Sequence, residues 1–424
     1  MIYKVNKVNH PHDIKACVPG SKSITNRALL IAALSNGRSV LKGCLFSDDS
    51  RHFIDALISL GFPVVVDENK NEIIITGFSG KIPKSEATID VGSAGTAARF
   101  LTALLGLSKG RYRIVSSEQM KKRPMKELLQ SLESLGAKIE YEEEEFHFPF
   151  VIGHEGEYKE SVSIDVDKSS QFLSALLISA IVVNRDFNID VSGSHGMAYV
   201  EMTINMMRQF GVDVLKKNNS YTILKNSHYN GMQYCIEPDM SAACYFYAMS
   251  PLLNVKSQVL GVHMKSLQGD IAFLDVLSDM GCTISEEPEG IVCIPPADGV
   301  MKAGEWDLST FSDQTLTLAA IAPFANDKVV IRGVSHIRLQ ECDRINAIIT
   351  NLDAMGVKVR EKDGEISIWP GEIKSCQIQT FEDHRGAMSF SLPGLVKDGI
   401  EIIDPYCCKK TFENYFDELE KSAY

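Results

Sequence analysis

Five segments of the chain repeat one pattern of apolar and polar positions, in which an amphipathic helix leads into a glycine and then into a strand. An apolar residue precedes each glycine and another lies one helical turn earlier, as in a buried helix stripe. A β-branched residue three positions after the glycine fits a strand entered through a left-handed glycine cap. The glycines are Gly61, Gly136, Gly211, Gly281 and Gly356. Each segment therefore predicts the end of one helix and the start of one strand.

A second series of predicted helices alternates with the first, and each opens on small or polar residues before an apolar run. The openings recur at nearly equal intervals, at Ser21, Ser93, Ser169, Ser241, Ser312 and His384. In the first of these helices, Ile24, Ala28, Ile31 and Leu34 predict the buried stripe. The chain thus predicts an α/β fold built from six βαβαββ units. Because the period is too long for a solenoid, we expect closed assemblies of units.

Six units divide naturally into three plus three, which predicts two domains. We expect a discontinuous domain of residues 1–18 and 238–424, and an inserted domain of residues 19–237. The amino-terminal strand, at about residues 2–17, is then expected to pair with the second half of the chain.

Composition narrows the class of protein. A formal net charge of -12 argues against a nucleic-acid partner, because phosphate backbones recruit broad basic surfaces. The ten cysteines show no CxxC spacing, which is typical of reduced thiols. The longest apolar run, residues 172–183, is too short to span a membrane, and the first residues contain no signal-peptide core. We therefore expect a cytoplasmic protein with no membrane partner.

The helix openings carry the candidate chemistry. A helix amino terminus presents free N–H groups and a partial positive charge, so it binds phosphate or carboxylate even in an acidic protein. Ser and Asp at such positions can also be ordinary N-caps, and that reading stays open for each opening. Cations are disfavoured there unless an anion is bound, which gives weight to Lys22, Arg27, Arg99 and Arg385. The pattern predicts an anion-binding cleft.

Several segments resemble signature sequences of the EPSP synthase family, in the same order and along the whole chain. They are PGSKSITNRALLIAAL, GSAGTAARF, KKRPM, KSSQFLSALL, ECDRI, EDHRGAMSFSL and KKTF. The resemblance implies the two-domain, inside-out α/β barrel of enolpyruvyltransferases, with three units per domain and a cleft that closes on two substrates. It also implies a monomer that needs no metal and no organic cofactor. The chain has no His/Cys cluster of metal-ligand spacing, no GxGxxG motif and no P-loop.

The activity that the resemblance implies is enolpyruvyl transfer. The enolpyruvyl (1-carboxyvinyl) group of phosphoenolpyruvate moves to the 5-hydroxyl of shikimate 3-phosphate, giving EPSP and phosphate by addition and elimination. This step belongs to the shikimate pathway, which leads to chorismate and the aromatic amino acids, and the family is the target of glyphosate.

Family roles transfer onto matching positions of this chain. The contacts implied for shikimate 3-phosphate are Lys22, Ser23, Arg27, Ser169, Ser170, Gln171, Tyr199, Asp313, His336, Arg338 and Gln340. Those implied for phosphoenolpyruvate are Lys22, Ser93, Gly95, Thr96, Arg123, Gln171, Arg344, Arg385 and Lys410. The implied catalytic residues are Asp313, Glu341, Lys22 and His384.

Addition followed by elimination needs an acid and a base of different protonation state. The resemblance makes Asp313 the base for the 5-hydroxyl proton and Glu341 the candidate acid, with Lys22 as its competitor. Glu341 has a difficulty, because Arg344 three residues on favours its ionised form unless burial or carboxylates oppose this. His384 either assists elimination or orients its neighbour in the chain.

The chain departs from the family pattern around the 3-phosphate. Gly196 and Met197 replace a phosphate-binding Ser and a Lys, and His336 and Gln340 stand where Asn and Lys are typical. Either other donors rebuild the phosphate site, or the acceptor lacks the phosphate. The candidate donors are His195, His336 and Arg338. We favour rebuilding, because the serine pair and glutamine at residues 169–171 are retained.

Two other functions remain to be weighed. UDP-N-acetylglucosamine enolpyruvyltransferases share the repeat architecture but carry a reactive Cys in the loop that corresponds to residues 116–124, where this chain has none. A binding protein without catalytic activity needs charge but no acid and base. The retained Asp313 and Glu341 therefore weigh against a binding protein.

Overall fold

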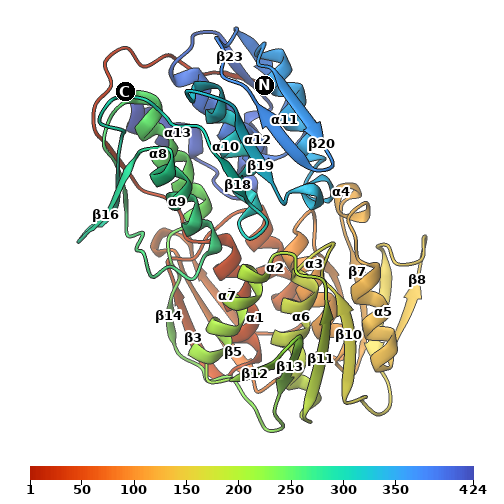
Figure 1. The fold of residues 1–424 in the computed structure, drawn as a ribbon. Coiled ribbons are helices and arrows are strands. Elements are labelled where there is room, and N and C mark those ends of the chain that lie inside the picture. Colours follow the sequence, from red (N-terminus) through yellow and green to blue (C-terminus); the bar gives the residue numbers. More distant parts are fainter. The chain divides into compact units, whose positions relative to one another are not determined.

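The computed structural model describes all 424 residues, and the chain divides into two compact units (Figure 1). Unit 1 comprises Met1–Pro19 and Glu237–Tyr424, and unit 2 comprises Gly20–Ile236. Among the helices, none combines the length and the hydropathy that a membrane crossing requires.

Unit 2 contains three four-stranded sheets, with strand orders β14-β3-β5-β4, β6-β7-β9-β8 and β10-β11-β13-β12. Their strands are β3 (Asn36–Lys42), β4 (Val64–Asp67), β5 (Glu72–Phe78), β6 (Glu86–Asp90), β7 (Arg111–Val115), β8 (Ala137–Tyr141), β9 (Phe150–His154), β10 (Ser161–Asp165), β11 (Phe187–Ser192), β12 (Val214–Lys217), β13 (Ser220–Ile223) and β14 (Gln233–Cys235). The helices are α1 (Lys22–Leu34), α2 (Asp48–Ser59), α3 (Gly95–Gly106), α4 (Glu118–Lys121), α5 (Lys126–Leu135), α6 (Gln171–Ser179) and α7 (Met197–Gln209).

Unit 1 contains two four-stranded sheets, β16-β17-β15-β2 and β18-β19-β21-β20, and one three-stranded sheet, β1-β23-β22. Their strands are β1 (Ile2–Lys4), β2 (Ile14–Ala16), β15 (Ser257–Leu260), β16 (Thr283–Glu287), β17 (Gly290–Ile294), β18 (Glu305–Asp307), β19 (Val329–Arg332), β20 (Val359–Lys362), β21 (Glu365–Ile368), β22 (Cys376–Ile378) and β23 (Ile400–Ile403). The helices are α8 (Met240–Leu253), α9 (Phe273–Asp279), α10 (Thr315–Ile321), α11 (Arg344–Ala354), α12 (His384–Ser391) and α13 (Tyr415–Ala423).

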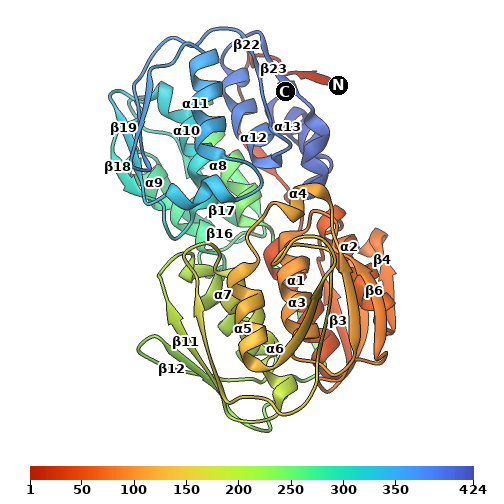
Figure 2. The ribbon, with the colours of Figure 1, turned by 90° about the vertical axis from the view of Figure 1, so that its right-hand side faces the viewer.

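Every sheet follows one plan, which confirms the predicted six-fold repeat. Each begins with a parallel pair, such as β6 with β7 or β10 with β11, and adds antiparallel strands on one side. Strands β6 and β10 alternate exposed and buried positions, so one side of each strand faces solvent and the other faces the helices. Figure 2 shows α1, α3 and α6 between the strands of unit 2.

The five helix–glycine–strand junctions also form as predicted. Gly61, Gly136, Gly211, Gly281 and Gly356 all have positive φ, between 74° and 107°. The helices before them are α2, α5, α7, α9 and α11, and the strands after them are β4, β8, β12, β16 and β20. The left-handed backbone explains why glycine occupies each junction.

One local prediction was too narrow. Helix α1 is not buried along a single stripe, because every residue from Ile24 to Leu34 is buried, including Thr25 and Asn26. A helix surrounded by sheets and other helices has no solvent face, so its polar residues are buried with the apolar ones. The innermost helix of each repeat opens at the positions that the sequence marked.

The amino-terminal segment pairs with the second half of the chain, as predicted. Strand β1 runs antiparallel to β23, with Ile2 opposite Ile403, and β2 runs parallel to β15. Two sheets of unit 1 therefore include a strand from the first residues of the chain.

Candidate functional site

Lys22 begins α1 in unit 2. Ser21 caps the helix, because its hydroxyl accepts from the Ile24 backbone N–H at 3.4 Å. The Lys22 ammonium lies 3.5 Å from a carboxylate oxygen of Asp49, which is 2% exposed. Asp49 was missed by the sequence analysis. The helix N-terminus and Lys22 together supply positive charge at this opening.

Arg27 lies one turn further along α1 and is anchored by three of its N–H groups. Nε donates to the Thr203 hydroxyl at 2.7 Å, Nη1 to the Ser23 carbonyl at 2.9 Å, and Nη2 to the Tyr199 carbonyl at 3.2 Å. Burial lowers the pKa of Arg27 to about 10, so the guanidinium keeps its charge at neutral pH. The anchored guanidinium is suited to a carboxylate, which it can bind in a bidentate manner.

The opening of α3 lies against the loop before α5. A Cβ atom at Gly95 would lie 2.6 Å from Nη1 of Arg123, so only glycine leaves room for that guanidinium. Arg99, within the first turns of α3, donates to the Gln171 side chain at 2.7 Å and to the Pro124 carbonyl at 3.2 Å. These contacts connect the openings of α3 and α6.

The opening of α6 carries the serine pair. Ser169 and Ser170 are 8% and 5% exposed, and the Ser169 hydroxyl accepts from the Gln171 backbone N–H at 3.3 Å. Gly196, at the start of α7, has φ +64°, and a Cβ there would lie 2.5 Å from the Ser170 hydroxyl oxygen. The backbone and the neighbouring serine both favour glycine, which accounts for this departure from the family pattern.

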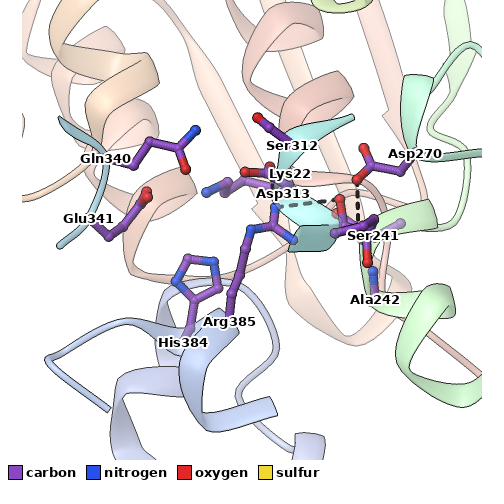
Figure 3. A network of polar contacts seen from close by, with 12 residues as sticks. Lys22, Ser241, Ala242, Asp270, Ser312, Asp313, Gln340, Glu341, His384 and Arg385 are labelled. Carbon is purple, nitrogen blue, oxygen red and sulfur yellow. Dashed lines mark hydrogen bonds and ion pairs between the residues drawn. The ribbon is translucent and has the colours of Figure 1, made fainter. Parts of the chain in front are cut away.

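In unit 1, Asp313 lies in the 3-10 turn η4 (Ser312–Gln314) that leads into α10. One carboxylate oxygen is 2.9 Å from Nη1 of Arg344. The other is 2.7 Å from Nη2 of Arg385 (Figure 3). The Asp313 side chain is 19% exposed, and that of Arg344 is 1% exposed. A carboxylate between two guanidinium groups is held in its ionised form.

Arg344 begins α11 and uses all its donors within the protein. Nε donates to the Asp383 carboxylate at 2.7 Å. Nη1 donates to Asp313 and to Gln340. Nη2 donates to Glu341 at 2.9 Å and also to Asp383. Burial alone lowers the pKa of Arg344, but the charges of these carboxylates raise it above its ordinary value. The Arg344 to Glu341 pair also favours the ionised carboxylate, as the sequence spacing suggested.

The opening of α12 is capped by Asp383, which the sequence analysis overlooked. Its carboxylate accepts from the Arg385 backbone N–H at 2.9 Å and is fully buried. His384 is 1% exposed beside it. An Asp directly before a helix is the usual signal of an N-cap, so the DHR segment contained the information.

The remaining implied residues occupy different surroundings. His336 Nε2 lies 2.8 Å from the Ser312 hydroxyl, whereas Arg338 is 37% exposed and pairs with Asp343 and Glu361. Lys410, at the end of the 3-10 helix η8 (Pro405–Lys410), is 7% exposed.

The predicted site residues divide into two sets according to the unit that contains them. The set of unit 2 contains Lys22, Ser23, Arg27, Ser93, Gly95, Thr96, Arg123, Ser169, Ser170, Gln171 and Tyr199. The set of unit 1 contains Asp313, His336, Arg338, Gln340, Glu341, Arg344, His384, Arg385 and Lys410.

Known proteins resemble this chain along its whole length. The model of the EPSP synthase (3-phosphoshikimate 1-carboxyvinyltransferase) family matches residues 10–419. A 3-phosphoshikimate 1-carboxyvinyltransferase of Nostoc punctiforme is 39% identical over 97% of both chains, and one of Vibrio campbellii is 38% identical over 95% of both. The solved EPSP synthase of Acinetobacter baumannii has a TM-score of 0.82 at 22% identity, covering 100% of this chain and 98% of its own, so the two share a fold. The chain belongs to the EPSP synthase family.

Proposed function

We propose that this chain transfers the enolpyruvyl group of phosphoenolpyruvate to the 5-hydroxyl of shikimate 3-phosphate, releasing phosphate in the shikimate pathway. The observation that carries the proposal is Asp313, held ionised by Arg344 and Arg385 at the opening of α10. The family and the activity for which its relatives are named support the same reaction.

Unit 2 supplies the groups that suit the two anions. Arg27 binds the shikimate carboxylate in this proposal, since its guanidinium is anchored and charged. Ser169 and Ser170 bind the 3-phosphate with hydroxyl and backbone donors at the opening of α6. Arg123, beside Gly95, binds phosphoenolpyruvate.

Asp313 is the proposed base. It takes the proton of the 5-hydroxyl while that oxygen forms a bond to C2 of phosphoenolpyruvate and the methylene carbon gains a proton from an acid. The C2–O bond to phosphate then breaks, and the methyl group loses a proton as the double bond reforms. The two substrates supply every atom of the two products, EPSP and phosphate, so the reaction needs no further reactant.

The acid must be protonated at neutral pH. Glu341 is bound to Arg344 at 2.9 Å, which favours its ionised form, whereas Lys22 is a charged donor 3.5 Å from Asp49. We propose Lys22 as the acid that protonates the methylene, with Glu341 placed to accept the proton in elimination. For His384 we retain both alternatives: it assists elimination, or it orients Arg385.

We also propose that the protein acts as a monomer in the cytoplasm. All ten cysteines are free thiols, and free thiols are typical of reducing compartments. UDP-N-acetylglucosamine enolpyruvyl transfer is not favoured, because the loop of residues 116–124 contains no cysteine and the matching relatives are named for the shikimate reaction.

The test is a coupled phosphate-release assay with both substrates. The proposal predicts turnover with shikimate 3-phosphate and far less with unphosphorylated shikimate. Asp313→Asn should lower kcat by at least about a hundredfold, because it removes the base, while leaving substrate binding measurable. Asp298→Asn, in an exposed turn, is the matched control. Wild-type activity retained by Asp313→Asn, or a preference for shikimate, contradicts the proposal.

A further inference from the structure

Asp270 is a buried carboxylate next to the proposed base, and none of the roles assigned above includes it. It lies in the 3-10 turn η3 (Gly269–Ala272) and is 2% exposed. Its Oδ1 accepts a hydrogen bond of 2.8 Å from the side-chain amide of Gln314, the residue directly after Asp313. The carboxylate is therefore joined to the turn that holds the base.

This hydrogen bond is part of a network that connects three repeats of unit 1. The amide oxygen of Gln314 accepts from the Thr317 hydroxyl at 3.0 Å, and that hydroxyl lies 3.3 Å from the Ser389 hydroxyl of α12. Gln314, Thr317 and Ser389 are fully buried. A buried network in which each group has a partner fixes the rotamers of its members.

The turn that carries Asp270 is itself fixed on its other side. Gln268, 4% exposed, donates to the Pro238 carbonyl at 2.8 Å and accepts from the Met240 backbone N–H at 2.9 Å. Glu237 accepts from the Leu267 backbone N–H and from Ser266. The segment leading into α8 thus holds the turn in place.

The charges around Asp270 distinguish it from an ordinary structural acceptor. The titratable and charged groups that face it are Asp313, Arg385, Asp239 and Cys244. Burial, followed by the charge of Asp313, raises the pKa of Asp270 to about 6, while Arg385 and the Gln314 hydrogen bond oppose the rise. A neutral residue could accept the hydrogen bond from Gln314 without the cost of burial and of repulsion from Asp313. The negative charge of Asp270 is therefore expected to have a function of its own.

We propose that Asp270 is a positioning residue for the proposed base: it holds the turn of Asp313 through Gln314, and its negative charge keeps Asp313 able to accept a proton. The inference rests on the proposed function. Two guanidinium groups stabilise the ionised Asp313 so strongly that they weaken it as a base. A like charge nearby acts in the opposite direction, because repulsion between two carboxylates raises the proton affinity of both.

Asp270→Asn separates the two parts of the proposal, since it keeps an acceptor for Gln314 and removes the charge. We expect the midpoint of the acidic limb of the kcat profile to move about one pH unit lower, and the plateau kcat to fall about threefold, with little change in KM. Gln314→Met removes the hydrogen bond and keeps the charge. It should lower kcat without moving the midpoint.

Asp275→Asn is the matched control, because Asp275 is exposed on α9. Tryptophan fluorescence verifies that each variant is folded. An unchanged acidic midpoint in Asp270→Asn overturns the electrostatic role, and wild-type kcat in Gln314→Met overturns the positioning role. If Asp270→Asn does not fold, Gln314→Met still decides whether the turn must be held. Absence of turnover in the wild type is a different result, since it refutes the proposed function itself.

Discussion

Replacing Asp270 by asparagine should stabilise unit 1 in a pH-dependent way. Burial and the charge of Asp313 raise the pKa of Asp270 from 3.8 to about 6. Between these values the folded state binds more protons than the unfolded state, so stability falls as pH rises. The destabilisation is absent below the unfolded value and complete above the folded one. A shift of about two pKa units corresponds to about 3 kcal/mol at full ionisation.

The asparagine variant has no such charge, so its advantage grows with pH. By the same linkage relation, ionised Asp270 destabilises the wild type by about 1 kcal/mol at pH 4.5 and about 3 kcal/mol at pH 8. The free energy of unfolding of Asp270→Asn, relative to wild type, should therefore be about 2 kcal/mol more favourable at pH 8 than at pH 4.5. Any loss from an imperfect amide hydrogen bond is equal at both pH values and cancels in this difference.

Tryptophan fluorescence reports on the relevant unit, because Trp306 and Trp369 both belong to unit 1. Urea unfolding at the two pH values yields the four free energies, and Asp275→Asn serves as the control with no expected pH dependence. An equal effect of Asp270→Asn at both pH values, or a larger advantage at pH 4.5, would refute the electrostatic reasoning.

Three further substitutions test the set in unit 2. Gly95→Ala should raise the KM for phosphoenolpyruvate several-fold, about 1 kcal/mol in binding, because the new Cβ displaces Arg123; an unchanged KM in steady-state kinetics contradicts this placement. Gly196→Ser, which restores the family residue, should lower stability by about 1 to 2 kcal/mol in calorimetry, since its backbone is left-handed and Ser170 is too close. Arg27→Lys should raise the KM for shikimate 3-phosphate about tenfold, because an ammonium cannot replace the anchored fork; equal KM values would exclude the assigned contact.

The repeat was predictable because its signals are local. An apolar pair one turn apart and a glycine that adopts positive φ lie within a few residues of each other, and the same spacing occurs five times. The polar openings were equally visible, since Lys22 and Ser169 stand at the starts of their helices. Because these signals recur at regular intervals along the chain, they also predicted that the sheets would repeat one plan.

The pairings within the site were not predictable in the same way. Arg344 contacts Asp313, 31 residues before it, and Asp383, 39 residues after it. No local pattern relates such positions, because these separations match neither the helix period nor the interval between successive helix openings. Asp270 illustrates the same limit, since only the packed structure reveals that this carboxylate is buried and joined to Gln314.

The pairing of β1 with β23 and β2 with β15 has a consequence for synthesis. Unit 2 is one continuous stretch, Gly20–Ile236, so it can fold while the ribosome is still translating the rest. The first two strands emerge earliest, yet β23 must wait until residue 403 has left the exit tunnel. β2 can pair as soon as β15 has emerged, whereas β1 keeps an unpaired edge until β23 is available, so β1 is the strand left exposed longest during synthesis.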